Sequence, residues 1–265
     1  MDLQLSGRRA VVTGASRGIG RATAVALAAE GVRVALVARD RTGLVETAAA
    51  VRDHGSAALV RPTDTRDDEA VRAMAAEVAD AWGGIDVLVN AAARPASSAP
   101  VPALADLSDD ALRAEPETKV LGYLRCARAV APHMIAAGWG RIINVSGLNA
   151  RISGSLVGSV RNVAVAAMTK NLADELGPSG ITVTVVHPGT TVTEALPQRL
   201  ADRADRDGTT VAELTSRLAG GTSIGRLVTA EEVADVITFL ASPRSAAITG
   251  DAIAVGGGTR GAIHY

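Results

Sequence analysis

The stretch that most constrains the fold runs from Arg9 to Gly20 and reads RAVVTGASRGIG. Its first half is an apolar run typical of a buried strand, and a loop with Gly14 and Gly18 follows. Such a loop needs glycine because a Cβ would restrict the backbone dihedrals and keep a phosphate away from the backbone. An alanine-rich helical segment begins at Ile19, so free N–H groups and a helix N-terminus meet at one point. The pattern predicts a pyrophosphate site.

Strand and helix patterns alternate along the rest of the 265 residues. Further strand-like segments begin at residues 32, 57, 85, 140, 181 and 251. This alternation predicts an α/β fold with one doubly wound, Rossmann-type domain and a seven-stranded parallel sheet. A long helix is expected over residues 109–137, kinked or delayed by Pro116. The polar stretch 190–223 is too long for an ordinary connection and predicts a substrate lid within the single domain 1–265.

Composition and charge exclude several classes of function. A formal net charge of -1 with scattered basic residues gives no reason to expect nucleic acid or an anionic membrane as a partner. No apolar segment resembles a signal peptide or a membrane span, so a cytoplasmic location is expected. One cysteine and four scattered histidines predict neither an intrachain disulfide nor a metal site.

Several ordered motifs occur on these elements. They are TGASRGIG from Thr13, DVLVNAA from Asp86, GRIINVS from Gly140, HPGTTVT from His187 and ITGDAIAVGGG from Ile248. Together they resemble the short-chain dehydrogenase/reductase family over nearly the whole chain. The resemblance implies an oxidoreductase that binds a nicotinamide dinucleotide and acts on a small carbonyl or alcohol. It also implies a homodimer or homotetramer, assembled through the helices near residues 110–135 and 160–176.

The end of the second strand indicates which dinucleotide is bound. Family members that use NAD usually have an acidic residue there, whereas this chain has Ala38 and Arg39, with Arg17 in the glycine loop. Two guanidinium groups attract a 2′-phosphate, so we expect NADP(H). The alternative is that Asp40 fills the acidic role and both arginines lie in solvent.

The resemblance also implies further cofactor contacts, taken position by position. Asn90 opens the family's Asn-Asn-Ala-Gly motif, which reads NAAA here, so Ala91 and Ala93 depart from the pattern. Asp64 is expected beside the adenine. The full set of expected cofactor-binding residues is Gly14, Ser16, Arg17, Gly18, Ile19, Gly20, Arg39, Asp64, Thr65, Asn90, Ala92, Asn162, Pro188, Gly189 and Thr193.

The catalytic residues that the resemblance implies are absent. The family moves a proton to or from the substrate oxygen with a serine, a tyrosine, a lysine four residues after it and an asparagine. The corresponding positions hold Gly147, Gly158, Asn162 and Lys119. Ser146 lies one residue before the serine position. On a strand this offset turns the side chain to the opposite face unless the strand has already ended.

The asparagine and the lysine look exchanged between two helices. Lys119 would bring its ammonium near the place of the family lysine, and Asn162 would keep a hydrogen bond to the ribose. Lys119, with its pKa lowered by desolvation, and Ser146 are the candidate catalytic residues. The alternative for Lys119 is an exposed helical lysine. Tyr265 is a further candidate acid, whereas Tyr123 is expected to pack at an interface.

Three functions are compatible with this sequence. The predicted one is a divergent NADP(H)-dependent reductase or dehydrogenase, because Pro188, Gly189 and Thr193 of the nicotinamide side are retained. The second is a non-redox lyase, isomerase or dehydratase in which Lys119 serves as a base or holds an enolate. The third is a protein without turnover, either a redox sensor or a partner subunit of an active homologue. Residues 94–105 and 194–223 are expected to form the substrate pocket walls.

Overall fold

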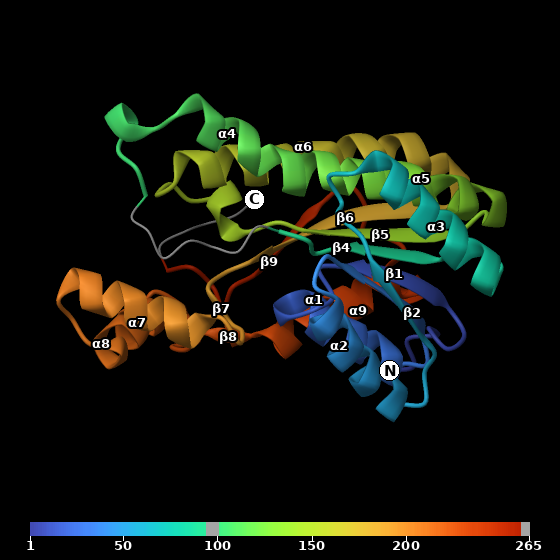
Figure 1. The fold of residues 1–265 in the computed structure, drawn as a ribbon, viewed down its shortest axis with the longest axis horizontal. Coiled ribbons are helices and arrows are strands. Elements are labelled where there is room, and N and C mark those ends of the chain that lie inside the picture. Colours follow the sequence, from blue (N-terminus) through green and yellow to red (C-terminus); the bar gives the residue numbers. More distant parts are fainter. Residues whose placement is uncertain (94–100, 261–265) are drawn as a thin grey trace.

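A parallel seven-stranded sheet runs through the centre of the computed structural model, which describes residues 1–93 and 101–260 (Figure 1). The strands are β1 (Arg9–Thr13), β2 (Arg33–Ala38), β3 (Ala58–Pro62), β4 (Val87–Asn90), β5 (Gly140–Val145), β6 (Ile181–Pro188) and β9 (Ala252–Val255). Their order is β3-β2-β1-β4-β5-β6-β9, and each neighbouring pair is parallel. The predicted α/β class and the seven-stranded parallel sheet are confirmed.

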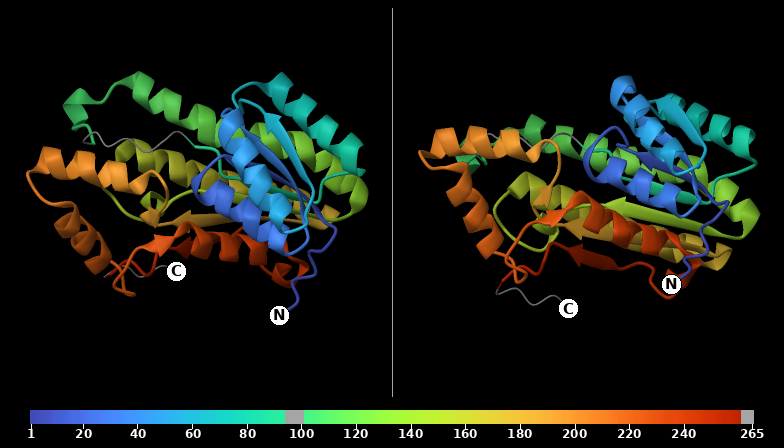
Figure 2. Two further views of the ribbon diagram at one scale, coloured as in Figure 1. Left: turned by 60° about the horizontal axis from the view of Figure 1, so that its bottom comes forward. Right: turned by 90° about the horizontal axis from the view of Figure 1, so that it is seen from below.

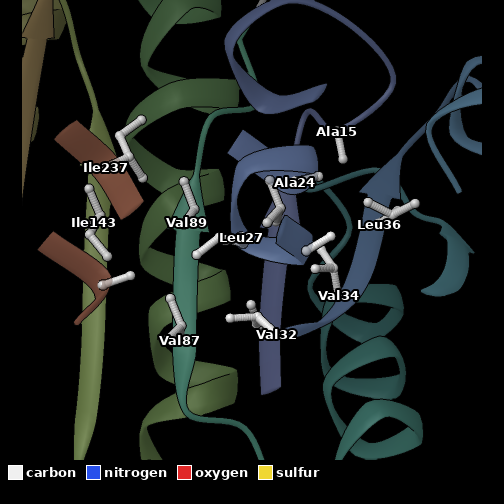
Figure 3. Packing of buried hydrophobic residues seen from close by; sticks show 14 of the residues in the cluster. Ala15, Ala24, Leu27, Val32, Val34, Leu36, Val87, Val89, Ile143 and Ile237 are labelled. Carbon is white, nitrogen blue, oxygen red and sulfur yellow. The ribbon is translucent and has the colours of Figure 1, made fainter. Parts of the chain in front are cut away.

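Helices cover both faces of this sheet (Figures 1 and 2). One face packs against α1 (Gly18–Ala29), α2 (Arg41–Asp53) and α9 (Ala230–Ala241), and the other against α3 (Asp68–Trp82), α5 (Gly122–Ala137) and α6 (Leu156–Leu176). Strand side chains alternate between the two layers. Figure 3 shows Leu27 of α1 among Val34 and Leu36 of β2 and Val87 and Val89 of β4. Among the described residues, no helix combines the length and the hydropathy that a membrane crossing needs.

The strand order reverses beside β1. From β1 the chain proceeds outward to β2 and β3, and then returns to β4 on the other side of β1. In an open parallel sheet, this reversal leaves a crevice at the carboxyl ends of the strands, where ligands bind. The topology therefore places a ligand crevice next to the glycine loop, which follows β1.

The helix expected over residues 109–137 is divided in three. It consists of α4 (Asp109–Pro116), a π-helical turn η2 (Glu117–Leu121) and α5. Pro116 cannot donate a backbone hydrogen bond, and the wider π turn begins directly after it. An extra residue in a turn rotates the side chains that follow. Lys119, in the middle of this turn, is buried with 6% of its surface exposed.

The long polar stretch after β6 forms two helices, α7 (Leu196–Asp207) and α8 (Val211–Gly220). They extend away from the sheet (Figure 1), and Leu196, Leu200 and Leu214 belong to a small apolar cluster of their own. Two short strands, β7 (Thr191–Val192) and β8 (Val228–Thr229), pair beside them. The lid function of this region stays a prediction. The remaining short helices are η1 (Leu104–Asp106), η3 (Leu148–Ala150), η4 (Gly177–Ser179) and η5 (Pro243–Ser245).

Stacked arginines mark the opposite, amino-terminal end of the sheet. Trp139, just before β5, contacts both Arg8 and Arg141, whose Cζ atoms are 3.9 and 4.4 Å from the ring centroid. The Arg33 Cζ atom lies 6.0 Å from the ring centroid of Trp82, at the end of α3. Cations over an indole face are attracted by the ring quadrupole. Both indoles are therefore held at the end of the sheet away from the ligand crevice.

Candidate functional site

A cavity of about 440 Å³ opens at the carboxyl end of the sheet, where the strand order reverses. Its wall combines the glycine loop, the ends of β2 to β5 and the segment before α7. The predicted cofactor-binding residues in this wall are Gly14, Ser16, Arg17, Gly18, Ile19, Gly20, Arg39, Asp64, Thr65, Ala92 and Thr193. Lys119 and Ser146 lie in the same wall. The two predicted catalytic residues and most of the predicted cofactor residues thus share one cavity.

Four of the predicted cofactor residues are not part of that wall. Asn90 is buried in β4, where its Nδ2 donates to Asn144 Oδ1 at 3.0 Å. Asn162 is buried in α6 behind Ser146. Pro188 ends β6 and Gly189 follows it. Direct contact of these four residues with a cofactor stays a prediction.

The glycine loop brings the amino end of α1 to the cavity. A Cβ on Gly20 would lie 2.3 Å from the Gly14 carbonyl oxygen, so the helix can start here only with glycine. Gly18 has a φ of +57°, in the left-handed region. Its N–H donates to Glu194 Oε2 at 2.9 Å. A carboxylate already bound at this helix end indicates that the loop accepts an anion, as a pyrophosphate site must.

The cationic groups of the wall fit a phosphate on the ribose. Arg17 and Arg39 are exposed and line the cavity. Asp40, the alternative ribose ligand, caps α2 by accepting a hydrogen bond from the Gly43 N–H at 3.2 Å. This cap gives Asp40 a structural role. The two arginines are therefore the groups best suited to recognise this end of the dinucleotide.

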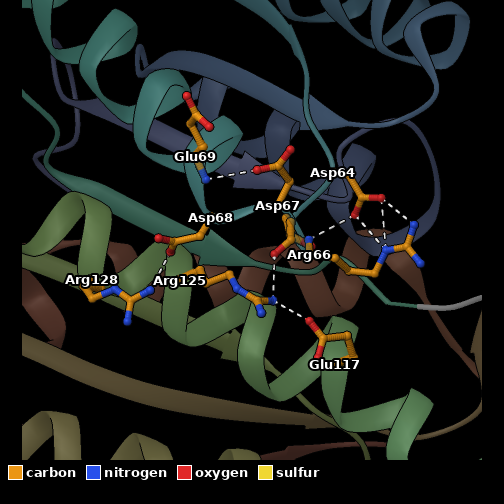
Figure 4. Close-up of polar contacts among 9 residues, drawn as sticks. Asp64, Arg66, Asp67, Asp68, Glu69, Glu117, Arg125 and Arg128 are labelled. Carbon is orange, nitrogen blue, oxygen red and sulfur yellow. Dashed lines mark hydrogen bonds and ion pairs between the residues drawn. The ribbon is translucent and has the colours of Figure 1, made fainter.

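Asp64, expected beside the adenine, is bound by an arginine that the sequence analysis missed. Arg66 donates through Nη2 to Asp64 Oδ2 at 2.6 Å, and its Nε contacts both carboxylate oxygens (Figure 4). These hydrogen bonds hold the pKa of Asp64 below its usual range. Arg66 is also in the cavity wall. In the sequence, only the short spacing between Asp64 and Arg66 indicates that the two side chains could pair.

Lys119 extends from η2 to the backbone at the end of β5. Its Nζ donates to the Ser146 carbonyl oxygen at 2.7 Å. The pKa of Lys119 is lowered from its usual 10.5 to about 7: burial is the largest cause, the positive charge of Arg161 also lowers it, and the negative charge of Glu115 acts to raise it. The alternative of an exposed helical lysine is wrong, because the π turn directs this side chain inward.

Ser146 lies just beyond the last residue of β5, Val145. The strand has already ended there, so the alternation that would turn its side chain away no longer applies. Its hydroxyl donates to the Asn162 carbonyl oxygen at 3.2 Å. The hydroxyl proton is therefore directed at α6, and Ser146 supports Lys119 through its own carbonyl group.

Neighbouring side chains fill the space at the two glycines that replace the family's serine and tyrosine. A Cβ on Gly147 would lie 3.0 Å from Asn162 Nδ2. A Cβ on Gly158 would lie 2.9 Å from Ser155 Oγ. Ser155 caps α6 by accepting a hydrogen bond from the Gly158 N–H at 3.1 Å. A side chain at either position would require one of these neighbours to shift, so the local packing fits glycine.

The remaining candidates do not take part in this cavity or lie beyond the described chain. Tyr123 is fully buried, and its hydroxyl donates to the Val145 carbonyl oxygen at 2.9 Å. The prediction that it packs at a subunit interface is wrong. Tyr265 and residues 94–100 of the predicted pocket wall lie outside the described residues. Within the described ranges, no cluster of three or more histidine, cysteine or acidic side chains could hold a metal ion.

Comparisons with known proteins agree with this architecture. Residues 14–260 match the family model described as enoyl-(acyl carrier protein) reductase. The chain is 38% identical over 253 residues to the short-chain reductase protein NovJ of Streptomyces niveus, covering 94% of this chain and 92% of that protein. It is 36% identical over 256 residues to the cis-4-hydroxycyclohexanecarboxylate dehydrogenase of Sinomonas cyclohexanicum, covering 95% and 96%.

A solved structure extends the likeness to the whole fold. L-sorbose reductase from Gluconobacter frateurii, complexed with NADPH and L-sorbose, superimposes with a TM-score of 0.92 at 30% identity. The match covers 99% of this chain and 100% of that one. With the ordered motifs and the doubly wound sheet, these matches show that the chain belongs to the short-chain dehydrogenase/reductase family of oxidoreductases.

Proposed function

We propose that this protein is an NADP(H)-dependent oxidoreductase that reduces a small carbonyl compound or oxidises the corresponding alcohol. One observation carries the proposal: a buried lysine of lowered pKa, Lys119, shares a cavity with an anion-accepting glycine loop. The fold likeness to a reductase solved with NADPH and a ketose supports the same choice.

The cofactor is held by residues of the cavity wall. The N–H groups at the start of α1 bind the pyrophosphate in place of the Glu194 carboxylate. Arg17 and Arg39 bind the 2′-phosphate through charge-assisted hydrogen bonds. A bound NADPH supplies the hydride for carbonyl reduction.

Lys119 supplies the proton in place of the absent tyrosine. With its pKa lowered to about 7, Lys119 can exchange between the ammonium and the neutral amine near neutral pH. During reduction the ammonium donates a proton from Nζ to the carbonyl oxygen of the substrate, and the neutral amine then takes a proton from solvent. During oxidation the neutral amine accepts the proton of the alcohol. The hydrogen bond to Ser146 O orients Nζ for both directions.

The test combines calorimetric titration with NADPH and an absorbance assay of its oxidation. The carbonyl panel includes ketoses and oxocyclohexanecarboxylates, chosen after the two relatives that act on sugars and cyclic alcohols. We expect NADPH to bind and at least one carbonyl compound to oxidise it. Product formed while NADPH is unchanged would favour the lyase or isomerase alternative. Binding without any product would favour the sensor or partner subunit.

Replacing Arg39 with aspartate is expected to weaken NADPH binding about 10- to 100-fold, because hydrogen bonds between charged groups contribute roughly 1.5–3 kcal/mol. Affinity for NADH should rise, since a carboxylate can accept the ribose hydroxyls. Arg41→Asp is the matched control. It makes the same charge change at an exposed residue outside the cavity wall. Equal losses in both variants would mean that the loss comes from the change of charge in general and not from a contact between Arg39 and the 2′-phosphate.

We also propose that the protein assembles as a homodimer or homotetramer through α6. Leu156, Val160 and Val163 are 50%, 47% and 50% exposed and lie on one side of this helix. An exposed apolar stripe of this kind favours a protein interface. Analytical ultracentrifugation should find an oligomer, and Val160→Asp should dissociate it. A monomeric parent protein would contradict the proposal.

A further inference from the structure

An ion pair that no motif includes lies beside the proposed catalytic lysine. Arg161 of α6 contacts Glu115 of α4 through Nη1 and Oε2. Both side chains are mostly buried, with 22% and 24% of their surfaces exposed. The pair connects α4 to α6, and the π turn that carries Lys119 follows α4 directly. Two opposite charges are thus fixed close to Lys119.

A continuous series of contacts joins this pair to Lys119. Arg161 Nε contacts Asn162 Oδ1 at 3.4 Å, and the Asn162 carbonyl oxygen accepts from Ser146 Oγ at 3.2 Å. The Ser146 carbonyl oxygen in turn accepts from Lys119 Nζ at 2.7 Å. Charges act on each other more strongly in a buried site than in water. The positive charge of Arg161 therefore disfavours the ammonium form of Lys119, and the negative charge of Glu115 favours it.

Other charged groups around η2 have partners of their own. Glu117 of the same turn pairs with Arg125 of α5 at 2.8 Å, and Asp64 after β3 pairs with Arg66 at 2.6 Å (Figure 4). The remaining charged groups of the cavity wall are Arg17, Arg39, Asp40, Glu194 and Arg199. Arg17, Arg39 and Asp40 lie on the proposed cofactor side, Glu194 accepts a hydrogen bond from the Gly18 N–H, and Arg199 lies on α7. The pair between α4 and α6 supplies charges from the helices that adjoin η2.

We propose that Glu115 and Arg161 are positioning residues that set the protonation state of Lys119. Glu115 stabilises the ammonium form, and Arg161 stabilises the neutral amine. The inference rests on the proposed function, in which Lys119 carries the proton. Because the two charges act in opposite directions, a substitution at either position changes the proton affinity of Lys119 without altering the lysine itself.

The chain allows a direct test because it contains two lysines, Lys119 and Lys170. Lys170 is exposed and pairs with Asp174, so it serves as an internal reference. Acetic anhydride reacts with the neutral amine, and peptide mass spectrometry across a pH series gives a labelling midpoint for each lysine in the intact protein. We expect Glu115→Gln to move the Lys119 midpoint to lower pH and Arg161→Gln to move it to higher pH. The Lys170 midpoint should stay where it is.

Conservative and combined variants separate charge from packing. Arg161→Lys keeps the charge and should keep the parent midpoint, and the double variant Glu115→Gln/Arg161→Gln should lie between the two single variants. Shifts in one common direction, or no shift in folded variants, would overturn the inference. Labelling needs no turnover. Midpoints that move as expected, with no oxidation of NADPH by any carbonyl, would therefore leave the role of the pair intact and reject the proposed reaction.

Discussion

Replacing Lys119 with methionine is expected to remove most of the turnover and to stabilise the fold at the same time. General acid–base groups contribute about 10²- to 10⁴-fold to rate, so carbonyl reduction should fall by a factor in this range. Methionine is apolar and has an unbranched side chain, so it can occupy the space between η2 and Ser146. The rate loss is measured by NADPH oxidation with the best substrate of the carbonyl panel.

The gain in stability follows from the cost of burying the ammonium. The pKa of Lys119 falls from 10.5 in the unfolded chain to about 7 in the folded one. Below pH 7 Lys119 is charged in both the folded and the unfolded chain, so folding carries the full free-energy cost of burying the ammonium. Between pH 7 and 10.5 only the unfolded chain is charged, so the cost declines as pH rises. The lost hydrogen bond to the Ser146 carbonyl oxygen offsets part of this gain. The net effect of Lys119→Met should be a rise in the free energy of unfolding on the order of 2 kcal/mol at pH 6.

Urea unfolding followed by circular dichroism at pH 6 and pH 9 measures this effect. The gain should be smaller at pH 9. Lys170→Met is the matched control, because that lysine is exposed and its substitution should change neither turnover nor stability by much. Unchanged turnover in Lys119→Met would remove the lysine from the mechanism. A pH-independent loss of stability would contradict the burial of a charge at this position.

Restoring the four family residues together is expected to raise carbonyl reduction at least about 100-fold over Gly158→Tyr alone. The combined variant carries Lys119→Asn, Gly147→Ser, Gly158→Tyr and Asn162→Lys. A tyrosine introduced alone displaces Ser155 Oγ from its cap on α6, which costs about 1 kcal/mol. It also lacks the lysine four residues later that the family uses to lower the pKa of the phenol.

Steady-state kinetics on the single and combined variants measure this dependence. The matched control is the combined variant with phenylalanine in place of tyrosine, which has the same ring without the hydroxyl. It lacks both Lys119 and the phenol, so its rate should fall about 10²- to 10⁴-fold below that of the tyrosine form. Equal rates for the tyrosine and phenylalanine forms would show that the phenol transfers no proton. A single Gly158→Tyr substitution with the full gain would contradict the coupling of Gly158 to the other three positions.

Local patterns in the sequence were sufficient for the frame of the fold. The seven parallel strands and the glycine loop follow from apolar runs and turn residues within short windows. The start of α9 is a capping box of Thr229 and Glu232, a spacing of three residues that is visible in the sequence itself. These features depend on neighbours a few residues apart, which a single sequence contains.

The orientation of Lys119 and Tyr123 could not be predicted in the same way. The sequence leaves Lys119 open between the cavity and solvent and places Tyr123 at an interface, and it gives no signal for the π turn after Pro116 that changes the helical periodicity here. For Ser146, the side-chain direction depended on whether β5 ends one residue earlier or later. Strand ends are uncertain by about that much when only the pattern is known.

The charged contacts of the site depend on residues far apart in the chain. Glu194 reaches Gly18 across 176 positions, and Arg161 reaches Glu115 across 46. Neither pairing leaves a local pattern, because each is created by the meeting of separate elements after folding. The cavity could be located from the sequence, whereas its charge balance required the structure.

The stacked arginines at the amino end of the sheet determine what intrinsic fluorescence can report. The two tryptophans of the chain, Trp82 and Trp139, lie beside guanidinium groups and at the end of the sheet opposite the cavity. Separation of these groups would alter the surroundings of both indoles. Indole emission is therefore a signal for loss of the sheet, and filling of the distant cavity should leave its wavelength almost unaltered.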